Sequence, residues 1–241
     1  GTLIWKNWQQ VPVTDPVTNS TLYFYEKINT LALSDLALVN IPGQSRKYKA
    51  LEMIVKKRFS KGWMMEVSYI LSKLEGLFNT SFSSTSGITS FYNNPNDHVN
   101  AIGRLENDRR HQLKVLGMVR GPWGVNLSGV IQWRSGNPYS RWLSSTEEGV
   151  YLNGDDSDSI IVGKRGEYVL PDQFNVDLAL EKQFKIKNFG LAVFAQAFNV
   201  FNSGVADGVQ TSTSHSSRPF GQMTSITDPF YLRIGARIDF N

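Results

Sequence analysis

Apolar and polar side chains alternate along much of the chain, and the last residues, Pro229 to Asn241, show this most clearly. One parity holds Phe230, Leu232, Ile234, Ala236, Ile238 and Phe240, and the other holds Tyr231, Arg233, Gly235, Arg237 and Asp239. Because side chains point alternately to the two faces of a strand, this stretch predicts one apolar and one charged face. A run of about eleven such residues has the length of a tilted strand that crosses a membrane.

Six further segments predict strands of the same kind: residues 48–59, 63–74, 110–119, 125–135, 173–184 and 189–202. In 189–202 apolar residues occur at both parities, which predicts a bulge or a strand packed on both faces. Residues 1–47 are less regular. They predict a strand at 21–27, a turn-rich stretch at 11–20, and a short helix or extended loop at 31–40.

The connections between these strands alternate between short and long. Short turns lie at 60–62, 121–124 and 185–188, whereas long segments span 75–109, 136–172 and 203–228. Outer-membrane barrels have short turns on the periplasmic side and long loops outside. The sequence therefore predicts an all-β, antiparallel transmembrane β-barrel, with 1–47 as an extracellular loop with partial strands and 48–241 as the strands and loops of the wall.

Seven strands are too few to be the whole barrel that this pattern predicts. An open sheet in lipid leaves two edges of unpaired backbone groups, at a cost of tens of kcal/mol by order of magnitude. We therefore expect these strands, about seven to nine in all, to be part of a larger barrel. In that barrel Leu127, Val176 and Leu232 turn to lipid and do not pack together in a common interior. The N-terminal residues lack the basic start and apolar core of a signal peptide, so we also expect an export leader outside this sequence.

Ten charged residues of the polar parity are expected to face the lumen, where they contact each other or a plug. Charges on the lipid face cost roughly 2–4 kcal/mol near the midplane, which favours the inward orientation. The ten residues are Glu52, Lys56, Arg58, Glu66, Lys114, Arg134, Asp177, Glu181, Arg233 and Arg237.

Four residues at the ends of strands or in long loops are candidates for ligand contact. Asp108, Arg109 and Arg110 lie where a long loop meets a strand, and Tyr139 lies in the next long loop. Arginine matches phosphate and carboxylate geometry, so the first three predict contact with an anionic substrate or with lipopolysaccharide phosphate. The alternative is an ion-paired strand end.

Composition excludes several classes of function. There is no cysteine, so disulfides and thiolate metal sites are excluded. The net charge of +4 is spread along the strands, which argues against a nucleic-acid partner. Three histidines lack ligand spacing, and the acidic run at Asp155, Asp156 and Asp158 lacks the spacing of a calcium loop. We expect no metal, cofactor or catalytic constellation, and hence no enzyme.

Several motifs carry a resemblance to a known family. They are Y-K-A-L-E-M-I-V-K-K-R-F-S-K-G-W at 48–63, V-S-Y-I-L-S-K at 67–73, D-R-R-H-Q-L-K-V at 108–115, P-W-G-V-N-L-S-G at 122–129, R-S-G-N-P-Y at 134–139, F-N-V-F-N at 198–202 and F-G-Q at 220–222. With the terminal strand, they make residues 45–241 resemble the C-terminal barrel portion of a TonB-dependent outer-membrane receptor, closest to the Oar-like branch.

The resemblance implies a bacterial outer-membrane transporter that imports a ligand with energy from TonB. It implies a 22-stranded barrel and an N-terminal plug, with the plug and the TonB-binding segment outside this sequence. Implied partners are outer-membrane lipid and lipopolysaccharide, the rest of the barrel, the plug, TonB and an additional surface protein. Three alternatives stay open: a passive channel or scaffold of a surface complex, an outer-membrane enzyme such as a protease or lipase, and a soluble β-sandwich.

Overall fold

The computed structural model describes residues 7–28, 45–77, 95–146, 149–152, 158–186, 189–213 and 218–240. The elements are β1 (Trp8–Thr14), β2 (Thr21–Lys27), β3 (Arg46–Ser60), β4 (Trp63–Gly76), η1 (Asn96–His98), β5 (Gly103–Arg104), β6 (His111–Arg120), η2 (Pro122–Gly124), β7 (Val125–Arg134), β8 (Pro138–Tyr139), β9 (Arg141–Ser144), β10 (Ser159–Val162), β11 (Tyr168–Val169), β12 (Gln173–Ile186), β13 (Phe189–Phe198), β14 (Ala206–Val209), β15 (Met223–Ile226) and β16 (Tyr231–Phe240).

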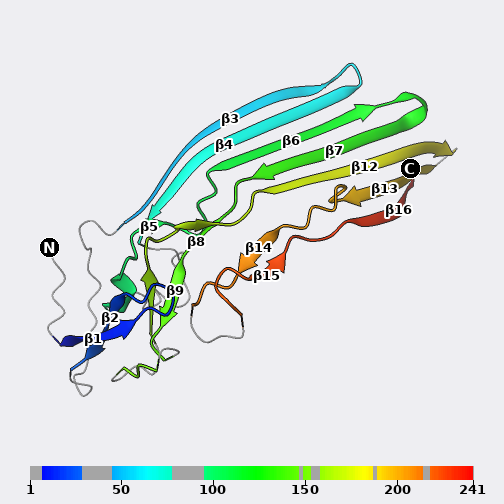
Figure 1. Cartoon of the computed structure of the whole chain (residues 1–241). Coiled ribbons are helices and arrows are strands. Elements are labelled where there is room, and N and C mark those ends of the chain that lie inside the picture. The colour runs from blue at the N-terminus through cyan, green and yellow to red at the C-terminus, as the bar shows by residue number, and fades with distance from the viewer. Residues whose placement is uncertain are drawn as a thin grey trace.

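One long, curved sheet dominates the molecule (Figure 1). Its strand order is β16-β13-β12-β7-β6-β4-β3, every long strand pairs antiparallel with its neighbour, and the short β5 adds to β4. These are the seven strands that the alternation predicts, and the all-β antiparallel class is confirmed. Within the described residues β3 and β16 form the two open edges of the sheet, as expected for part of a larger barrel.

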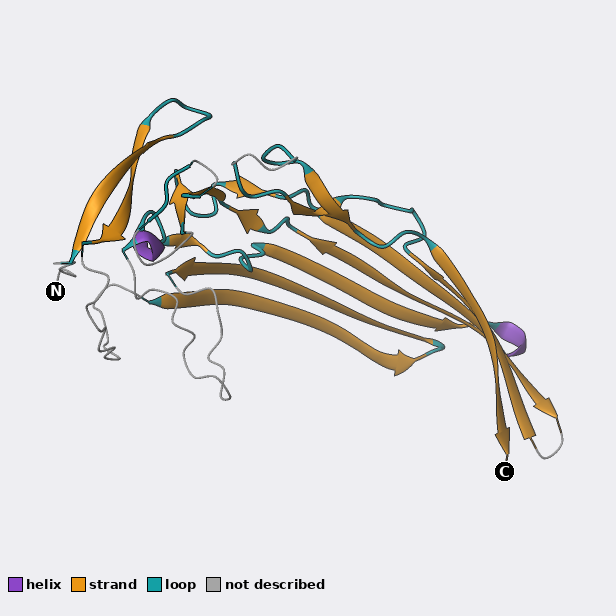
Figure 2. Ribbon diagram, turned by 90° about the horizontal axis from the view of Figure 1, so that it is seen from below, coloured by secondary structure: helices purple, strands orange, loops and turns teal. Residues whose placement is uncertain are grey.

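The short turns gather at one end of the sheet and the long connections at the other (Figure 2). The β3–β4 turn has only two residues, Lys61 and Gly62, with φ of 52° and 84°. Positive φ at both positions is the geometry of a tight hairpin turn whose twist matches that of the strands. In the β6–β7 turn Trp123 and Gly124 also have positive φ, at 57° and 72°.

The bulge expected in 189–202 is absent from β13, so that alternative is wrong. Phe189 to Phe198 pairs without a register shift with both β12 and β16. Apolar residues occur at both parities because the face with Ala192 and Phe194 is apolar, as is the face with Leu191 and Val193. Phe194 lies over Gly235, where an added Cβ would come within 2.5 Å of the ring. The strand ends at Phe198, and residues 199–202 turn away from it.

The N-terminal hairpin and the described parts of the first two long connections fold together at the loop end of the sheet. We call this body, which consists of β1, β2, η1 and β8 to β11, the loop cap. The β1–β2 hairpin packs on the β9–β10 hairpin through a small core, in which Phe24, Leu143 and Ile160 are at most 1% exposed. The turn-rich prediction for 11–20 is wrong at Val11–Thr14, which belongs to β1. Pro12 is tolerated there because β1 pairs on one side only within the described residues.

A buried ion pair joins the two hairpins of the loop cap. The Arg141 guanidinium donates to both carboxylate oxygens of Asp15 at 2.7 and 2.6 Å, and the Asp15 side chain is fully buried. The loop cap is also tied to the third long connection, because Trp142 forms a parallel bridge to Ser212 and donates its N–H to the Thr211 carbonyl at 2.8 Å. The strand β9 thus joins three separate parts of the chain.

Candidate functional site

The two faces of the main sheet differ in chemistry. The pairing register puts one apolar set on the same face from β3 to β16. Its exposed members are Leu51, Met53, Val55, Leu71, Val119, Leu127, Ile131, Phe174, Leu178, Leu180, Val193, Leu232, Ile234 and Ile238. Of the three residues expected to face lipid, Leu127 and Leu232 are 49% and 56% exposed, whereas Val176 is buried, with 8% of its surface exposed. These residues form a wall surface and not a common interior, as a lipid-facing band requires.

Two lysines outside the predicted set lie on this outer face, close to the turn end. Lys57 donates to the Ser60 carbonyl and hydroxyl at 3.0 and 2.9 Å and to the Trp63 carbonyl at 3.1 Å, and its amine sits 3.9 Å from the Trp63 ring centroid. Lys182 donates to the Trp123 carbonyl. Both amines therefore reach polar backbone at the membrane boundary while their stems stay on the apolar band. Trp63 and Trp123 are exposed here, as an aromatic girdle requires.

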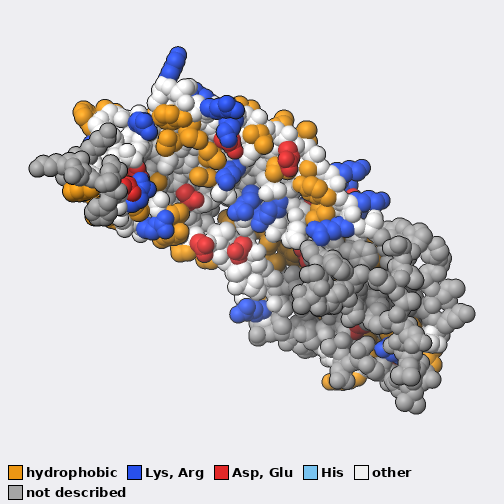
Figure 3. All heavy atoms as spheres, turned by 180° about the vertical axis from the view of Figure 1, so that it is seen from behind, with side chains coloured by type: hydrophobic (Ala, Val, Ile, Leu, Met, Phe, Trp, Pro, Cys, Tyr) orange, Lys and Arg blue, Asp and Glu red, His pale blue; other side chains and the backbone are white. Residues whose placement is uncertain are grey.

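The opposite face, which we call the inner face, carries nine of the ten charged residues that the pattern singles out. The register places these nine there together, and Arg58 lies in the irregular stretch between Lys57 and Ser60. Lys56 and Glu66 are cross-strand partners and form an ion pair at 2.8 Å. Figure 3 shows basic and acidic side chains interspersed over one face of the sheet, with no single-sign patch.

Asp108 is a structural anchor. Its side chain is fully buried, and it accepts the Leu74 N–H at 2.7 Å and the Arg104 Nε at 2.9 Å, with the Arg110 Nε 3.7 Å away. These contacts hold the first long connection against β4. They surround the carboxylate with one backbone N–H and two guanidiniums. For Asp108 and Arg110 the geometry favours the ion-paired strand end over contact with a ligand.

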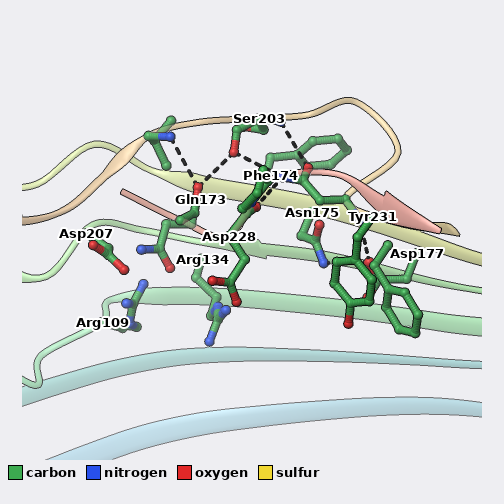
Figure 4. A pocket seen from close by; sticks show the side chains of 15 residues that line it. Arg109, Arg134, Gln173, Phe174, Asn175, Asp177, Ser203, Asp207, Asp228 and Tyr231 are labelled. Carbon is green, nitrogen blue, oxygen red and sulfur yellow. Dashed lines mark hydrogen bonds between the residues drawn. The ribbon is translucent and has the colours of Figure 1, made fainter. Parts of the chain in front are cut away.

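Arg109 points elsewhere, into a hollow of about 470 Å³ on the inner face (Figure 4). The hollow lies where the strands meet the long connections, and Arg134, Asp177 and Tyr231 also line it. The Nη1 of Arg109 donates to the Ser135 carbonyl at 3.1 Å. Burial, followed by the charge of the neighbouring Arg134, lowers the pKa of Arg109.

The F-N-V-F-N motif forms a tight turn that shapes one wall of the hollow. Asn199 and Asn202 both have positive φ, at 48° and 49°. Asn199 donates its side-chain amide to the Asp228 carbonyl at 2.8 Å and accepts the Ser203 N–H at 3.0 Å, and Asn202 accepts the Phe230 N–H at 2.9 Å. The two asparagines thus bring the end of β13 to the start of β16.

We expect Asn199→Ala to destabilise this turn by roughly 2–4 kcal/mol, because it removes buried hydrogen bonds and places a Cβ-bearing residue without polar compensation at positive φ. Asn199→Gly loses the same hydrogen bonds but tolerates the backbone, so it should cost about 1 kcal/mol less. Urea unfolding of the full-length protein in lipid vesicles measures both. Equal losses would show that the backbone conformation contributes nothing.

Tyr139 belongs to an aromatic cluster that two of the sequence motifs build together. Its ring centroid lies 5.4 Å from that of Tyr168 and 5.9 Å from that of Phe220, and the latter two are 4.9 Å apart. Burial, with a smaller contribution from Tyr168, raises the pKa of Tyr139. R-S-G-N-P-Y and F-G-Q therefore meet in space, although nothing in the sequence singles out Tyr168.

Some sequence-based expectations lie outside the described residues. They are the helix or loop at 31–40 and the residues His215, Asp155 and Asp156. Among the residues that are described, no group of three histidine, aspartate or glutamate side chains is arranged to hold a metal ion. No helix in this part of the chain is long and apolar enough to cross a membrane.

Comparison with known proteins adds a family. Two solved structures are similar: FpvA of Pseudomonas aeruginosa bound to a heterologous pyoverdine with iron, and the ferripyoverdine receptor of the outer membrane of Pseudomonas aeruginosa bound to ferripyoverdine. Identities are 15% and 16%, TM-scores 0.48 and 0.45, and coverage of this chain 97% and 94%. The chain spans only 23% and 21% of those proteins. No curated protein matches. The model of the outer membrane beta barrel domain matches residues 3–160, more than half of the chain, and the chain belongs to that family of bacterial outer-membrane barrels.

Proposed function

We propose that this chain forms wall and loops of a TonB-dependent outer-membrane transporter, in its C-terminal barrel portion and closest to the Oar-like branch. The observation that carries the proposal is the division of the main sheet into an apolar outer face and a charged inner face, with the folded connections at one end. Such a wall encloses a polar lumen when the barrel is completed. The motifs shared with TonB-dependent receptors support the energised class over a passive channel.

In the proposed mechanism the long connections, residues 75–109, 136–172 and 203–228, capture the ligand. Movement of a plug, driven by TonB, then opens a path along the inner face. The charged residues of that face, among them Glu181, Arg233 and Arg237, contact the plug or the passing ligand. In this arrangement residues 1–47 contribute extracellular loop and residues 48–241 contribute wall.

Lipopolysaccharide is the proposed neighbour at the loop end of the outer face. Lys49 and Lys73 are direct cross-strand partners beyond the apolar band, and Lys47 pairs with Glu75 nearby. Like charges directly opposite each other destabilise a sheet unless an anion lies between them. Lys73 is partly balanced by Glu75 at 2.6 Å, and a lipid phosphate would balance Lys49. An additional surface protein would rest on the loop cap.

The test uses the full-length protein in two assays. We expect micromolar binding to the purified periplasmic domain of TonB, and no steady conductance in planar lipid bilayers, because a plugged barrel is closed at rest. Deleting the N-terminal segment that contacts TonB is the control and should abolish binding without changing the bilayer result. A protein that ignores TonB and conducts continuously would instead be the passive channel.

A further inference from the structure

The hollow on the inner face brings together charged groups that are not paired with each other. Arg109 enters from the first long connection and Arg134 from the end of β7, and both lie on the same side of the hollow (Figure 4). Within the described residues neither guanidinium has a carboxylate within 4.0 Å. Two half-buried cations side by side repel each other, and the lowered pKa of Arg109 has this repulsion among its causes.

The position of Arg109 is fixed by the fold and not by a counter-charge. Its Nη1 donates to the Ser135 carbonyl at 3.1 Å, and the backbone N–H of Arg109 donates to the Asn107 carbonyl at 3.0 Å. Arg134 is set by β7, where it lies between Gln112 of β6 and Gln173 of β12 in the register. Glutamines therefore flank Arg134 in the register, and Arg109 uses one side-chain donor on the Ser135 carbonyl. Most N–H donors of the two guanidiniums stay available to a bound group.

Aromatic and acidic groups also line the hollow. Tyr231 stacks on Phe198 with ring centroids 4.4 Å apart, and both side chains lie on the inner face. Asp177, Asp207 and Asp228 line the hollow together with the arginines (Figure 4). Asp207 and Asp228 are exposed, and within the described residues neither forms an ion pair. A ligand with one acid group on an otherwise uncharged or cationic body matches this lining. A polyanion would be repelled by the carboxylates of Asp207 and Asp228.

We propose that this hollow is an anion-binding site in which Arg109 and Arg134 bind a single carboxylate, with Phe198 and Tyr231 contacting the apolar body attached to it. The planar fork of a guanidinium matches the two oxygens of a carboxylate. The volume of about 470 Å³ lies in the range of small-molecule sites, about 300–1,000 Å³. The inference rests on the proposed function in one respect, since it takes the inner face to be the side along which a ligand passes. The carboxylate comes either from a diffusible ligand or from an acidic side chain elsewhere in the full-length protein.

The probe is benzoate, which has one carboxylate on an aromatic ring, and benzamide is its neutral counterpart. Calorimetry with the full-length protein should show millimolar binding of benzoate and at least roughly tenfold weaker binding of benzamide, as expected for loss of a charge-assisted hydrogen bond. Arg134→Gln should weaken benzoate binding at least roughly tenfold and leave benzamide unchanged. Arg120→Gln, at the short-turn end of β6 and outside the hollow, is the matched control and should bind benzoate like the unsubstituted protein.

The two sources of the carboxylate give different results. A diffusible ligand predicts the calorimetric pattern above. An acidic side chain of the protein itself predicts no benzoate binding but a lower melting temperature for Arg134→Gln than for Arg120→Gln. Absence of both effects, or equal binding of benzoate and benzamide, overturns the proposal. TonB binding by the same preparations should be unaffected by either substitution, so that failure of the anion site remains distinct from failure of the transporter assignment.

Discussion

Substituting Arg141 with methionine should destabilise the loop cap by about 3–5 kcal/mol, because the Asp15 carboxylate would stay buried without its partner. In the intact protein both oxygens of Asp15 accept from Arg141, and the two side chains are 0% and 7% exposed. Hydrogen exchange of the full-length protein should show faster exchange in β1 and β2, with no change in β6 and β7 of the wall.

Two further variants make this prediction specific. Lys164→Met removes an exposed cation from the same long connection and should leave exchange unchanged. The double variant Asp15→Leu with Arg141→Met replaces the pair by apolar side chains and should recover most of the loss. If the double variant is no more stable than Arg141→Met, the ion pair is not the cause.

The pH dependence of the loop cap follows from the same pair. Chiefly the hydrogen bond from Arg141 lowers the pKa of Asp15 well below its usual range. A lowered folded-state pKa gives stability that is complete above the unfolded value, near 3.9, and is lost as the pH falls through the folded value. The contribution of this pair should therefore be constant from neutral pH down to about pH 5 and decline only in stronger acid.

Placing an arginine on the apolar face of the wall should have the second large effect. Leu180 lies in the middle of β12 and is 50% exposed on the outer face. Leu180→Arg should destabilise the full-length protein by about 2–4 kcal/mol in lipid vesicles, because the guanidinium would lie in hydrocarbon. Urea unfolding followed by tryptophan fluorescence measures the loss.

The adjacent residue provides a matched control. Ala179 lies on the opposite, inner face of the same strand, beside Ser128 and Gln196. Ala179→Arg should cost less than about 1 kcal/mol, since water and polar side chains can receive the charge. Equal losses at the two positions would contradict the assignment of outer and inner faces.

The strands of the barrel wall could be predicted because the two faces of each strand lie in different environments, which produces an alternating pattern of apolar and polar residues. Alternation locates β12 and β16, and the predicted strand at 21–27 has the bounds of β2. The pattern fails where both faces are apolar, as at Ala192 and Phe194 of β13. It also fails at β1, where Pro12 suggests a turn although one-sided pairing makes a strand possible.

The loop cap was not predictable from local pattern. Asp15 and Arg141 are 126 residues apart, and the short strands β8 to β11 are two to four residues long. Neither the periodicity of apolar residues nor the spacing of motifs predicts that such segments pack together. The same holds for the candidate site. The sequence points to Arg109 and Arg134 separately, but only the fold places them beside Asp207, Asp228 and Tyr231 in one hollow.

The small core of the loop cap is built without residues of the long wall strands. Phe24, Leu143 and Ile160 hold the two hairpins together from within, and β9 fastens them to the neighbouring connection. Exposed positions around this core can change without disturbing the packing of the wall strands. The same wall can therefore carry loop caps with different exposed surfaces.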